Sequence, residues 1–215
     1  MVPGRRTILL AMASAVLLAG CGRPGSMPKS MNDRPDDMTI GRADAPVTIV
    51  EYASVTCAHC AHFQAEVFPA LKAKYIDTGK VRYVFREYLT PPSNIAAAGF
   101  LLARCAGQDR YFDVVEAVMR AQPEMFRGAS TANALPTLRR IGHDFSIDDK
   151  RFDRCVTDAD GMKRIQAGMA ATDATTPIEG TPAFFVNGRF LQRTTGDIQD
   201  FDRALTPLLS QTDKP

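Results

Sequence analysis

The sequence predicts an α/β protein built as a β-α-β unit, an inserted helical block and a β-β-α unit. Two runs rich in β-branched and aromatic residues flank a long helical pattern, residues 93–174 are helical in periodicity almost throughout, and a hairpin signal precedes a final amphipathic segment. Hydrophobic residues make up 45% and charged residues 23% of the 215 positions, which excludes a disordered or collagen-like chain.

The first unit begins with a predicted strand over residues 46–53, which is β-branched and mostly apolar. A helix over residues 57–77 follows, and Pro69 should kink it because proline lacks the N–H that bonds to the preceding turn. A second strand over residues 81–85 then predicts a parallel crossover pair. Four residues at four-residue spacing predict the buried stripe of the helix: Phe63, Val67, Leu71 and Tyr75.

The C-terminal unit begins with a predicted apolar strand over residues 183–186. Asn187-Gly188 is a strong two-residue hairpin signal, so residues 189–191 form the return strand. An amphipathic helix over residues 197–209 closes the unit. The helices expected in the middle block lie near 93–106, 109–121, 131–142, 148–157 and 160–173.

Residues 1–20 have the anatomy of an export signal. Arg5 and Arg6 precede an uncharged and largely apolar stretch that is shorter than the roughly 20 apolar residues of a membrane-spanning helix. The Leu-Ala-Gly that precedes Cys21 resembles the lipobox of bacterial lipoproteins, in which cleavage before the cysteine is followed by lipidation of its thiol. The alternative cleavage, after Ala15, would leave apolar residues exposed at the new terminus.

A tether is expected to follow the signal. Residues 22–38 hold three prolines, two glycines and no branched aliphatic residue, so they cannot bury enough apolar surface to order themselves. This organisation predicts an extracytoplasmic or periplasmic protein held to a bacterial membrane by lipid. The predicted segments are a signal peptide over 1–20, a lipidated tether over 21–38, a body over 39–92 and 175–215, and an inserted helical domain over 93–174. Beyond residue 20, 24 basic residues face 24 acidic ones, so no nucleic-acid partner is expected.

An odd number of cysteines in an exported protein requires an explanation. Lipid on Cys21 supplies one and leaves four cysteines, which allow three pairings. Cys57 and Cys60 lie too close in sequence for both to reach distant partners easily. The simplest pairing is therefore 57 with 60 and Cys105 with Cys155.

The chemistry is expected at Cys57-Ala58-His59-Cys60, which begins a helix just after a strand. Unpaired N–H groups and the macrodipole at a helix N-terminus favour a thiolate, and His59 can add a donor or a positive charge. Cys60 shares the buried stripe, so Cys57 is the attacking cysteine and Cys60 the covered, resolving one. A thiol pKa lowered by several units makes the disulfide more oxidising by on the order of 100 mV.

This motif has two other possible interpretations. Cys57 and Cys60 with His62 could hold zinc, but structural zinc needs four ligands and usually a second separated pair. A purely structural 57–60 bridge would constrain little chain entropy. The sequence therefore predicts neither a metal nor another cofactor.

Three features together resemble the DsbA-type thiol–disulfide oxidoreductases, which have a thioredoxin fold with an inserted helical domain: the segment EYASVTCAHC (51–60), the helical block, and the segment GTPAFFVNG (180–188). The resemblance runs from about residue 39 to the C-terminus. It implies a cis peptide bond between Thr181 and Pro182, beside the active-site cysteines, whose backbone pairs with a bound substrate segment.

The resemblance also implies a role for Glu51, which matches the acidic residue that lies beneath the family's active site and influences proton transfer with Cys60. A solvated carboxylate at the strand end is the alternative. The chain departs from the best-known member at Ala58, where that protein has proline, and at Thr181, a residue also found in disulfide isomerases. Both positions tune the redox potential in this family.

Cys105 and Cys155 lie in two predicted helices of the inserted block. Two buried free thiols are one interpretation, but a structural bridge is favoured in an oxidising compartment. A bridge across this separation would stabilise the fold by roughly 4 kcal/mol on the loop-entropy model.

We therefore predict a monomeric, lipid-anchored thiol oxidase that acts on reduced or unfolded exported polypeptides. The resemblance implies that a quinone-linked membrane oxidase of the DsbB kind restores its disulfide. The alternatives are a reductase or isomerase on the same fold, and a metal-binding periplasmic protein that uses Cys57, Cys60 and His62.

Overall fold

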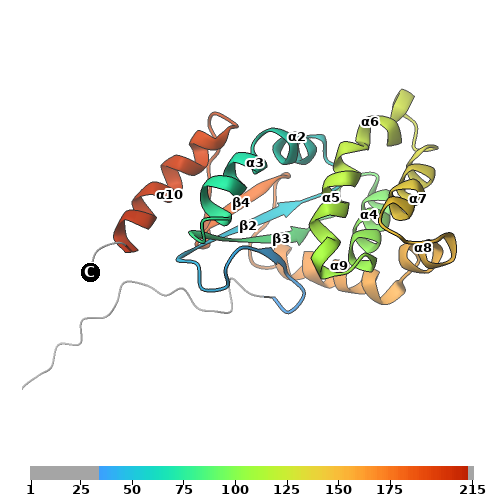
Figure 1. The fold of residues 1–215 in the computed structure, drawn as a ribbon, viewed down its shortest axis with the longest axis horizontal. Helices are drawn as coiled ribbons and strands as arrows, with labels where there is room; N and C mark the ends of the chain where they lie inside the picture. Colours follow the sequence, from blue (N-terminus) through green and yellow to red (C-terminus); the bar gives the residue numbers. More distant parts are fainter. Residues whose placement is uncertain (1–33, 213–215) are drawn as a thin grey trace, which may run out of the picture.

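A five-stranded mixed sheet forms the body of the computed structural model, which describes residues 34–212 (Figure 1). The strands, in the order in which they lie in the sheet, are β1 (Met38–Ile40), β3 (Val81–Glu87), β2 (Val47–Ala53), β4 (Ala183–Val186) and β5 (Arg189–Phe190). Strands β2 and β3 are parallel, and the other neighbouring pairs are antiparallel. The predicted α/β class, with its thioredoxin-type β-α-β and β-β-α units, is confirmed.

The helices divide into two groups. The body carries α2 (Ala58–Glu66), α3 (Phe68–Leu71), a π-helical turn (Lys72–Ile76) and α10 (Ile198–Thr212). The insertion consists of α4 (Ser93–Cys105), α5 (Tyr111–Arg120), α6 (Gln122–Met125), α7 (Ala134–Asp144), α8 (Asp149–Val156) and α9 (Ala159–Asp173), with short 3-10 turns at 108–110 and 127–129. The arrowheads of β2 and β3 point toward the insertion, so the carboxyl ends of the two parallel strands lie where the body and the insertion meet (Figure 1).

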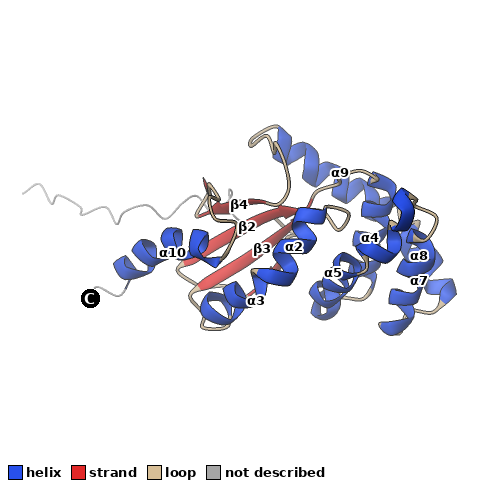
Figure 2. Cartoon of the chain, turned by 90° about the horizontal axis from the view of Figure 1, so that it is seen from above, coloured by secondary structure: helices blue, strands red, loops and turns tan. Residues whose placement is uncertain are grey.

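Strand alternation separates the two faces of the sheet. Helices α2, α3 and α10 cover one face (Figure 2), where the ring of Phe63 lies 4.6 Å from Phe184 and 5.8 Å from Phe201. The core on this side continues into the insertion without a break. The opposite face carries a smaller cluster, in which Val50 and Tyr52 pack with residues of β3 and β4. Because alternate β2 residues face the larger core, Glu51 points into it beneath α2.

The helix predicted over 57–77 is interrupted, but not at Pro69 itself. Helix α2 ends at Glu66, and Pro69 lies in the first turn of α3. A proline is tolerated there because the first helical N–H groups have no partner within the helix. The four predicted stripe residues are all buried despite the interruption: Phe63, Val67, Leu71 and Tyr75.

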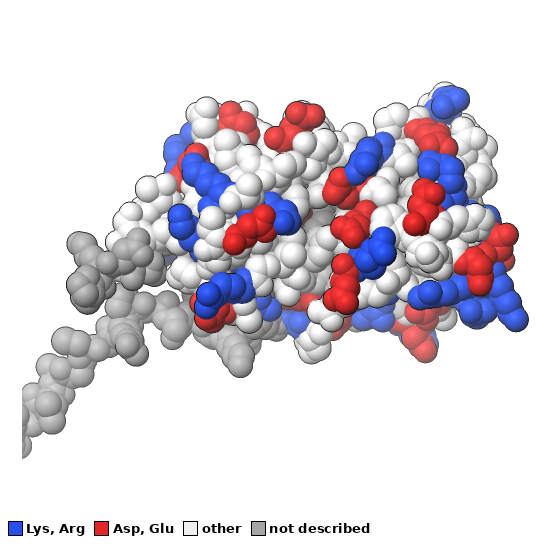
Figure 3. Space-filling model, viewed as in Figure 1, with Lys and Arg blue, Asp and Glu red and all other residues white. Residues whose placement is uncertain are grey.

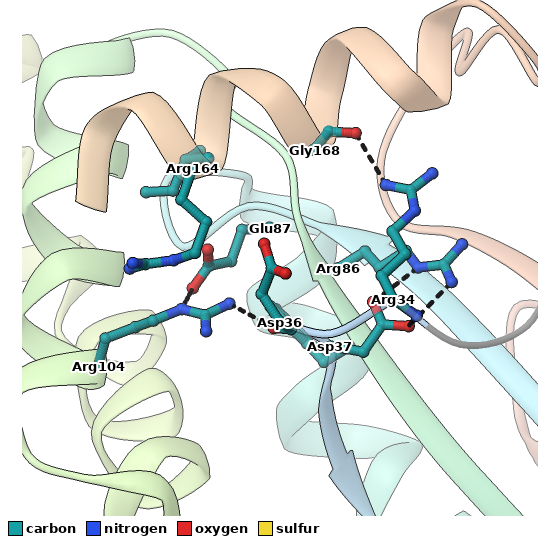
Figure 4. Close-up of a pocket in the computed structure, with 10 residues that line it drawn as sticks. Arg34, Asp36, Asp37, Arg86, Glu87, Arg104, Arg164 and Gly168 are labelled. Carbon is teal, nitrogen blue, oxygen red and sulfur yellow. Dashed lines mark hydrogen bonds and ion pairs between the residues drawn. The ribbon is translucent and has the colours of Figure 1, made fainter. Parts of the chain in front are cut away.

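Residues 34–38, which the sequence assigns to the tether, are part of the folded body. Met38 is buried in β1, an edge strand that the sequence did not predict. Asp37 forms a buried two-point ion pair with Arg86 of β3, at 2.9 Å for each contact. Arg34 donates to the carbonyl of Gly168 in α9 at 2.8 Å. Figure 4 shows these contacts, so the N-terminal strap (34–37) links the sheet to the insertion.

Within residues 34–212, no helix has both the length and the apolarity required to cross a membrane. On the face shown in Figure 3, basic and acidic side chains are interspersed, with no continuous basic surface. The predicted signal peptide, the lipid site at Cys21 and the tether up to residue 33 lie outside the described residues.

Candidate active site

Cys57 occupies the N-cap position of α2, directly after the turn that leaves β2. Its backbone is extended (φ −85°, ψ 120°), and its sulfur accepts a hydrogen bond from the amide of Cys60 at 3.4 Å. Cys57 is half-buried, whereas Cys60 has no exposed surface. Both thiols are free in this structure. The geometry thus presents one sulfur to solvent and covers the other, as the helix periodicity predicts.

The surroundings of Cys57 favour its thiolate. A hydrogen bond with the Cys60 side chain lowers the pKa of Cys57 to about 5, with further contributions from Thr181 and from the backbone amides of Cys60 and His59, while partial burial opposes the change. Donors that converge on a helix N-cap stabilise negative charge. Cys57 therefore carries the charge of an activated nucleophile at neutral pH.

Cys60 has the opposite environment. Burial, the hydrogen bond to Cys57 and the nearby Glu51 carboxyl all raise the pKa of Cys60 far above that of a free thiol. The backbone amide of Ser54 donates to its sulfur at 3.5 Å. A reduced Cys60 thus holds its proton at neutral pH, and the two sulfurs of one motif differ widely in acidity.

The loop before β4 brings Thr181 and Pro182 against Cys57. Their peptide bond is cis, and the Thr181 carbonyl accepts a hydrogen bond from the Cys57 thiol at 3.2 Å. Pro182 also lines an open cavity of about 510 Å³ together with apolar side chains that include Phe185 and Phe190. The backbone on which the resemblance places substrate pairing is therefore within reach of the reactive sulfur.

Glu51 is 1% exposed and accepts a hydrogen bond from the hydroxyl of Tyr83 on β3. Burial raises the pKa of Glu51 to about 8, although the Tyr83 hydrogen bond and the positive charge of Arg193 partly counteract the rise. Glu51 is therefore buried rather than solvated at the strand end. Below about pH 8 it carries a proton in the same interior as Cys60.

Within residues 34–212, the imidazole rings of His59 and His62 form no hydrogen bond with either sulfur. The side chains of His59 and His62 are exposed, and His59 contributes to the Cys57 environment through its backbone amide. In the described range 34–212, no group of three or more His, Cys, Asp or Glu side chains is arranged to hold a metal ion. The metal-binding alternative gains no support from this geometry.

Several residues that hold the active-site turn were not found from the sequence. The side-chain amide of Gln122 in α6 donates to the carbonyls of Val55 and Cys57, at 2.8 Å and 3.1 Å. On the other side, the Thr56 hydroxyl lies 2.9 Å from the Thr90 hydroxyl. The only sequence signal near these positions is that Thr56 and Thr90 each follow a predicted strand within a few residues, which does not identify a pair.

Cys105 and Cys155 form a disulfide that joins α4 to α8, with their Cα atoms 5.8 Å apart. Cys155 is buried, and the Cys105 carbonyl accepts a hydrogen bond from Arg151. This bridge lies within the insertion and is separate from the motif at the start of α2.

Comparison with known proteins places the chain in a family. The thioredoxin family matches residues 33–205, which is most of the sequence. The chain belongs to the thioredoxin family. Its fold is similar to the crystal structure of alpha-DsbA1 from Wolbachia pipientis, with a TM-score of 0.73 and 26% identity over 85% of this chain and 95% of that one. The DsbA-type resemblance seen in the sequence is thereby confirmed.

Two relatives from Rickettsia carry the provisional name of protein-disulfide oxidoreductase. The one from Rickettsia bellii is 33% identical over 153 residues, which cover 71% of this chain and 58% of the relative. The one from Rickettsia prowazekii is 31% identical over 192 residues, which cover 89% of this chain and 68% of the relative. The chain thus spans little more than half of the length of the first of these relatives.

Proposed function

We propose that this protein is a thiol–disulfide oxidoreductase that oxidises pairs of thiols in exported polypeptides through Cys57 and Cys60. One observation carries the proposal: the sulfur of the half-buried Cys57 lies at a helix N-cap that lowers its pKa to about 5, with Cys60 buried behind it. Stabilising the Cys57 thiolate stabilises the reduced protein, so the disulfide form is a strong oxidant.

The reaction consists of two thiol–disulfide exchanges. A substrate thiolate attacks the Cys57 sulfur of the 57–60 disulfide, which forms a substrate–Cys57 bond and breaks the bond to Cys60. The second substrate thiolate then attacks the substrate sulfur of this mixed disulfide and expels Cys57 as a thiolate. The substrate loses two electrons and gains a disulfide, while the protein gains two electrons and becomes a dithiol.

The two sulfurs suit different steps of this sequence. Cys57 departs readily in the second exchange because its low pKa makes it a good leaving group. Cys60 must take up a proton when it is released in the first exchange, since burial disfavours its thiolate. Glu51, protonated below about pH 8 in the same interior, is the proton source that this geometry supports.

Substrate and partner follow from this chemistry. An extended polypeptide with free thiols can approach Cys57 along the cis Thr181–Pro182 backbone, where the Thr181 carbonyl is already within 3.2 Å of the sulfur. The reduced protein then needs an acceptor for two electrons, which we assign to a quinone-linked membrane oxidase of the DsbB kind. Lipid on Cys21 would hold the protein at an extracytoplasmic membrane surface, near that partner.

The direction of electron flow is tested by equilibration with reduced and oxidised glutathione. We expect a potential well above that of thioredoxin, which lies near −270 mV. A potential close to the thioredoxin value would contradict the proposed oxidase function and indicate that the protein is a reductase. Thr181 is also found in disulfide isomerases, so isomerase activity is tested as well. An isomerase would rearrange a substrate with scrambled disulfides faster than it oxidises a reduced substrate.

The proposed anchor needs a separate test, because the oxidase chemistry does not depend on it. Cys21→Ser should move the protein from the membrane fraction to the aqueous phase in detergent partitioning, while purified protein keeps its exchange activity. Persistent partitioning of the variant into the membrane phase would exclude lipid on Cys21.

A further inference from the structure

The insertion makes a specific polar contact with the active-site turn through one side chain. Gln122, at the first position of α6, is 8% exposed, and its side-chain nitrogen donates to the carbonyls of Val55 and Cys57 at 2.8 Å and 3.1 Å. Both partners are acceptors, so the NH₂ end of the amide must face them, because the oxygen has no proton to share. The two bonded carbonyls flank Thr56 and bracket the turn that leads into α2.

The same turn contacts the insertion through close packing. Gly99 of α4 lies so near Val55 that a Cβ atom at this position would come within 2.8 Å of the Val55 side chain. Helix α4 therefore limits how far the turn can shift in that direction, and Gln122 limits how its peptide groups can rotate. The body holds the same turn through a separate contact, between the hydroxyls of Thr56 and Thr90.

The orientation of these peptide groups matters for the sulfur. The amides of His59 and Cys60 stabilise the Cys57 thiolate only while Cys57 keeps its N-cap conformation. The Cys57 carbonyl also accepts the first helical hydrogen bond, from Ala61 at 3.1 Å. A second donor at this carbonyl, from Gln122, draws electron density away from the peptide nearest the sulfur and fixes its plane.

We propose that Gln122 is a positioning residue through which the helical insertion sets the acidity and the oxidising strength of Cys57. This inference rests on the proposed function only for its physiological meaning, since the acidity of Cys57 can be measured without any substrate. Through Gln122, the insertion would then have a second role besides covering the body. It would fix the conformation of the active-site turn from outside the thioredoxin-type unit.

The test compares two variants of the full chain with the wild type. Gln122→Met keeps the length of the side chain and removes both donors. Gln122→Glu keeps its shape but places a carboxylate against two carbonyls, one of which belongs to Cys57. We expect the Cys57 pKa, measured from thiolate ultraviolet absorbance, to rise by about one unit in the first variant and further in the second. The equilibrium constant for oxidising glutathione should fall about tenfold with the first.

The matched control is Gln166→Met, which changes an exposed glutamine of α9 in the same insertion. It should leave the pKa and the glutathione equilibrium unchanged. If Gln122→Met lowers the melting temperature but leaves the Cys57 pKa at the wild-type value, Gln122 is a structural residue only and the inference is wrong. Gln122→Glu keeps the test decisive if the methionine variant does not fold. A wild-type protein that shows a low Cys57 pKa but no oxidase activity would refute the proposed function and leave this inference standing.

Discussion

The two cysteine pairs of this protein lie at opposite ends of helices. Cys57 caps the N-terminus of α2, whereas Cys105 and Cys155 lie in the last turns of α4 and α8. The helix macrodipole stabilises a thiolate at the first location and destabilises one at the second. A helix N-terminus therefore suits a sulfur that undergoes exchange, whereas the last turn of a helix suits sulfurs that form a permanent bridge.

The pairs also differ in what they constrain. Cys57 and Cys60 are three positions apart, so a bond between them closes a very small loop, while 50 positions separate Cys105 from Cys155. In the chain-entropy description, the longer loop contributes more to stability. The first pair is therefore suited to exchange chemistry and the second to stability, and both assignments can be tested.

The largest effect is expected from removing the reactive sulfur. Cys57→Ser should lower the rate of disulfide transfer to a reduced dithiol peptide by at least about 10⁴-fold, because no other described side chain can replace the nucleophile. Cys60→Ser is the informative partner variant: its Cys57 thiolate should attack the disulfide between glutathione and a peptide with a single cysteine and release one glutathione thiolate. The peptide should then stay on Cys57 as a mixed disulfide, visible by mass spectrometry, because no Cys60 thiol remains to displace it. Substantial turnover by Cys57→Ser would show that another cysteine, and not Cys57, is the nucleophile.

The second prediction concerns the bridge in the insertion. Replacing both Cys105 and Cys155 with alanine should lower the free energy of unfolding by about 4 kcal/mol, measured in urea, because the unfolded chain regains the entropy of a long loop. The folded variant should transfer disulfides at the wild-type rate. A folded variant without exchange activity would show that the two pairs are not independent.

The third prediction concerns Glu51 and the pH dependence of stability. A folded-state pKa of about 8 lies above the ordinary value near 4.3, so the folded protein binds a proton that the unfolded chain releases between these values. Stability must then decrease as the pH rises through this window. Glu51→Gln should abolish that decrease and, at pH 8, stabilise the protein by on the order of 5 kcal/mol. Glu66→Gln, on the exposed side of α2, is the control and should leave the pH profile unchanged.

The smallest expected effect is on how the rate of Cys57 alkylation depends on pH. Alkylation of Cys57 by iodoacetamide should proceed at a nearly constant rate above about pH 6 and fall tenfold for each pH unit below the pKa near 5, because only the thiolate reacts. Cys60 should stay unmodified in the folded protein because it is buried. A midpoint near pH 8.5, that of an ordinary thiol, would remove the basis of the comparison.

Local patterns allowed much of this architecture to be predicted. The β-branched run over 46–53 and the hairpin signal at Asn187-Gly188 identified β2 and the β4–β5 pair, because such signals act over a few neighbouring residues. The spacing of the α2 stripe placed Cys60 inside and Cys57 outside for the same reason. Pro69 was only partly informative about the helix. The helix is interrupted at Val67, two residues before Pro69, and a new helix begins with Pro69 in its first turn.

Long-range partners could not be predicted in this way. Tyr83 on β3 bonds to Glu51 on the neighbouring strand β2, and Gln122 bonds to Val55 from a separate helix. Neither pairing can be recognised from the local periodicity of the sequence. Strand β1 was missed because its sequence follows a proline-rich segment and its pairing depends on β3. These residues are fixed by the assembled fold, and one of them, Tyr83, is also among the groups that set the pKa of Glu51.

The ion-paired strap formed by residues 34–37 has a mechanical consequence. A pull on the chain ahead of Arg34 is carried by Asp37 to β3 and by Arg34 itself to α9, since both contacts cross between elements. The load is thus shared between the sheet and the insertion before it reaches β1. Cys57 begins a helix on the opposite face of the sheet, outside this line of force, so traction at the N-terminal end can be borne without disturbing the sulfur.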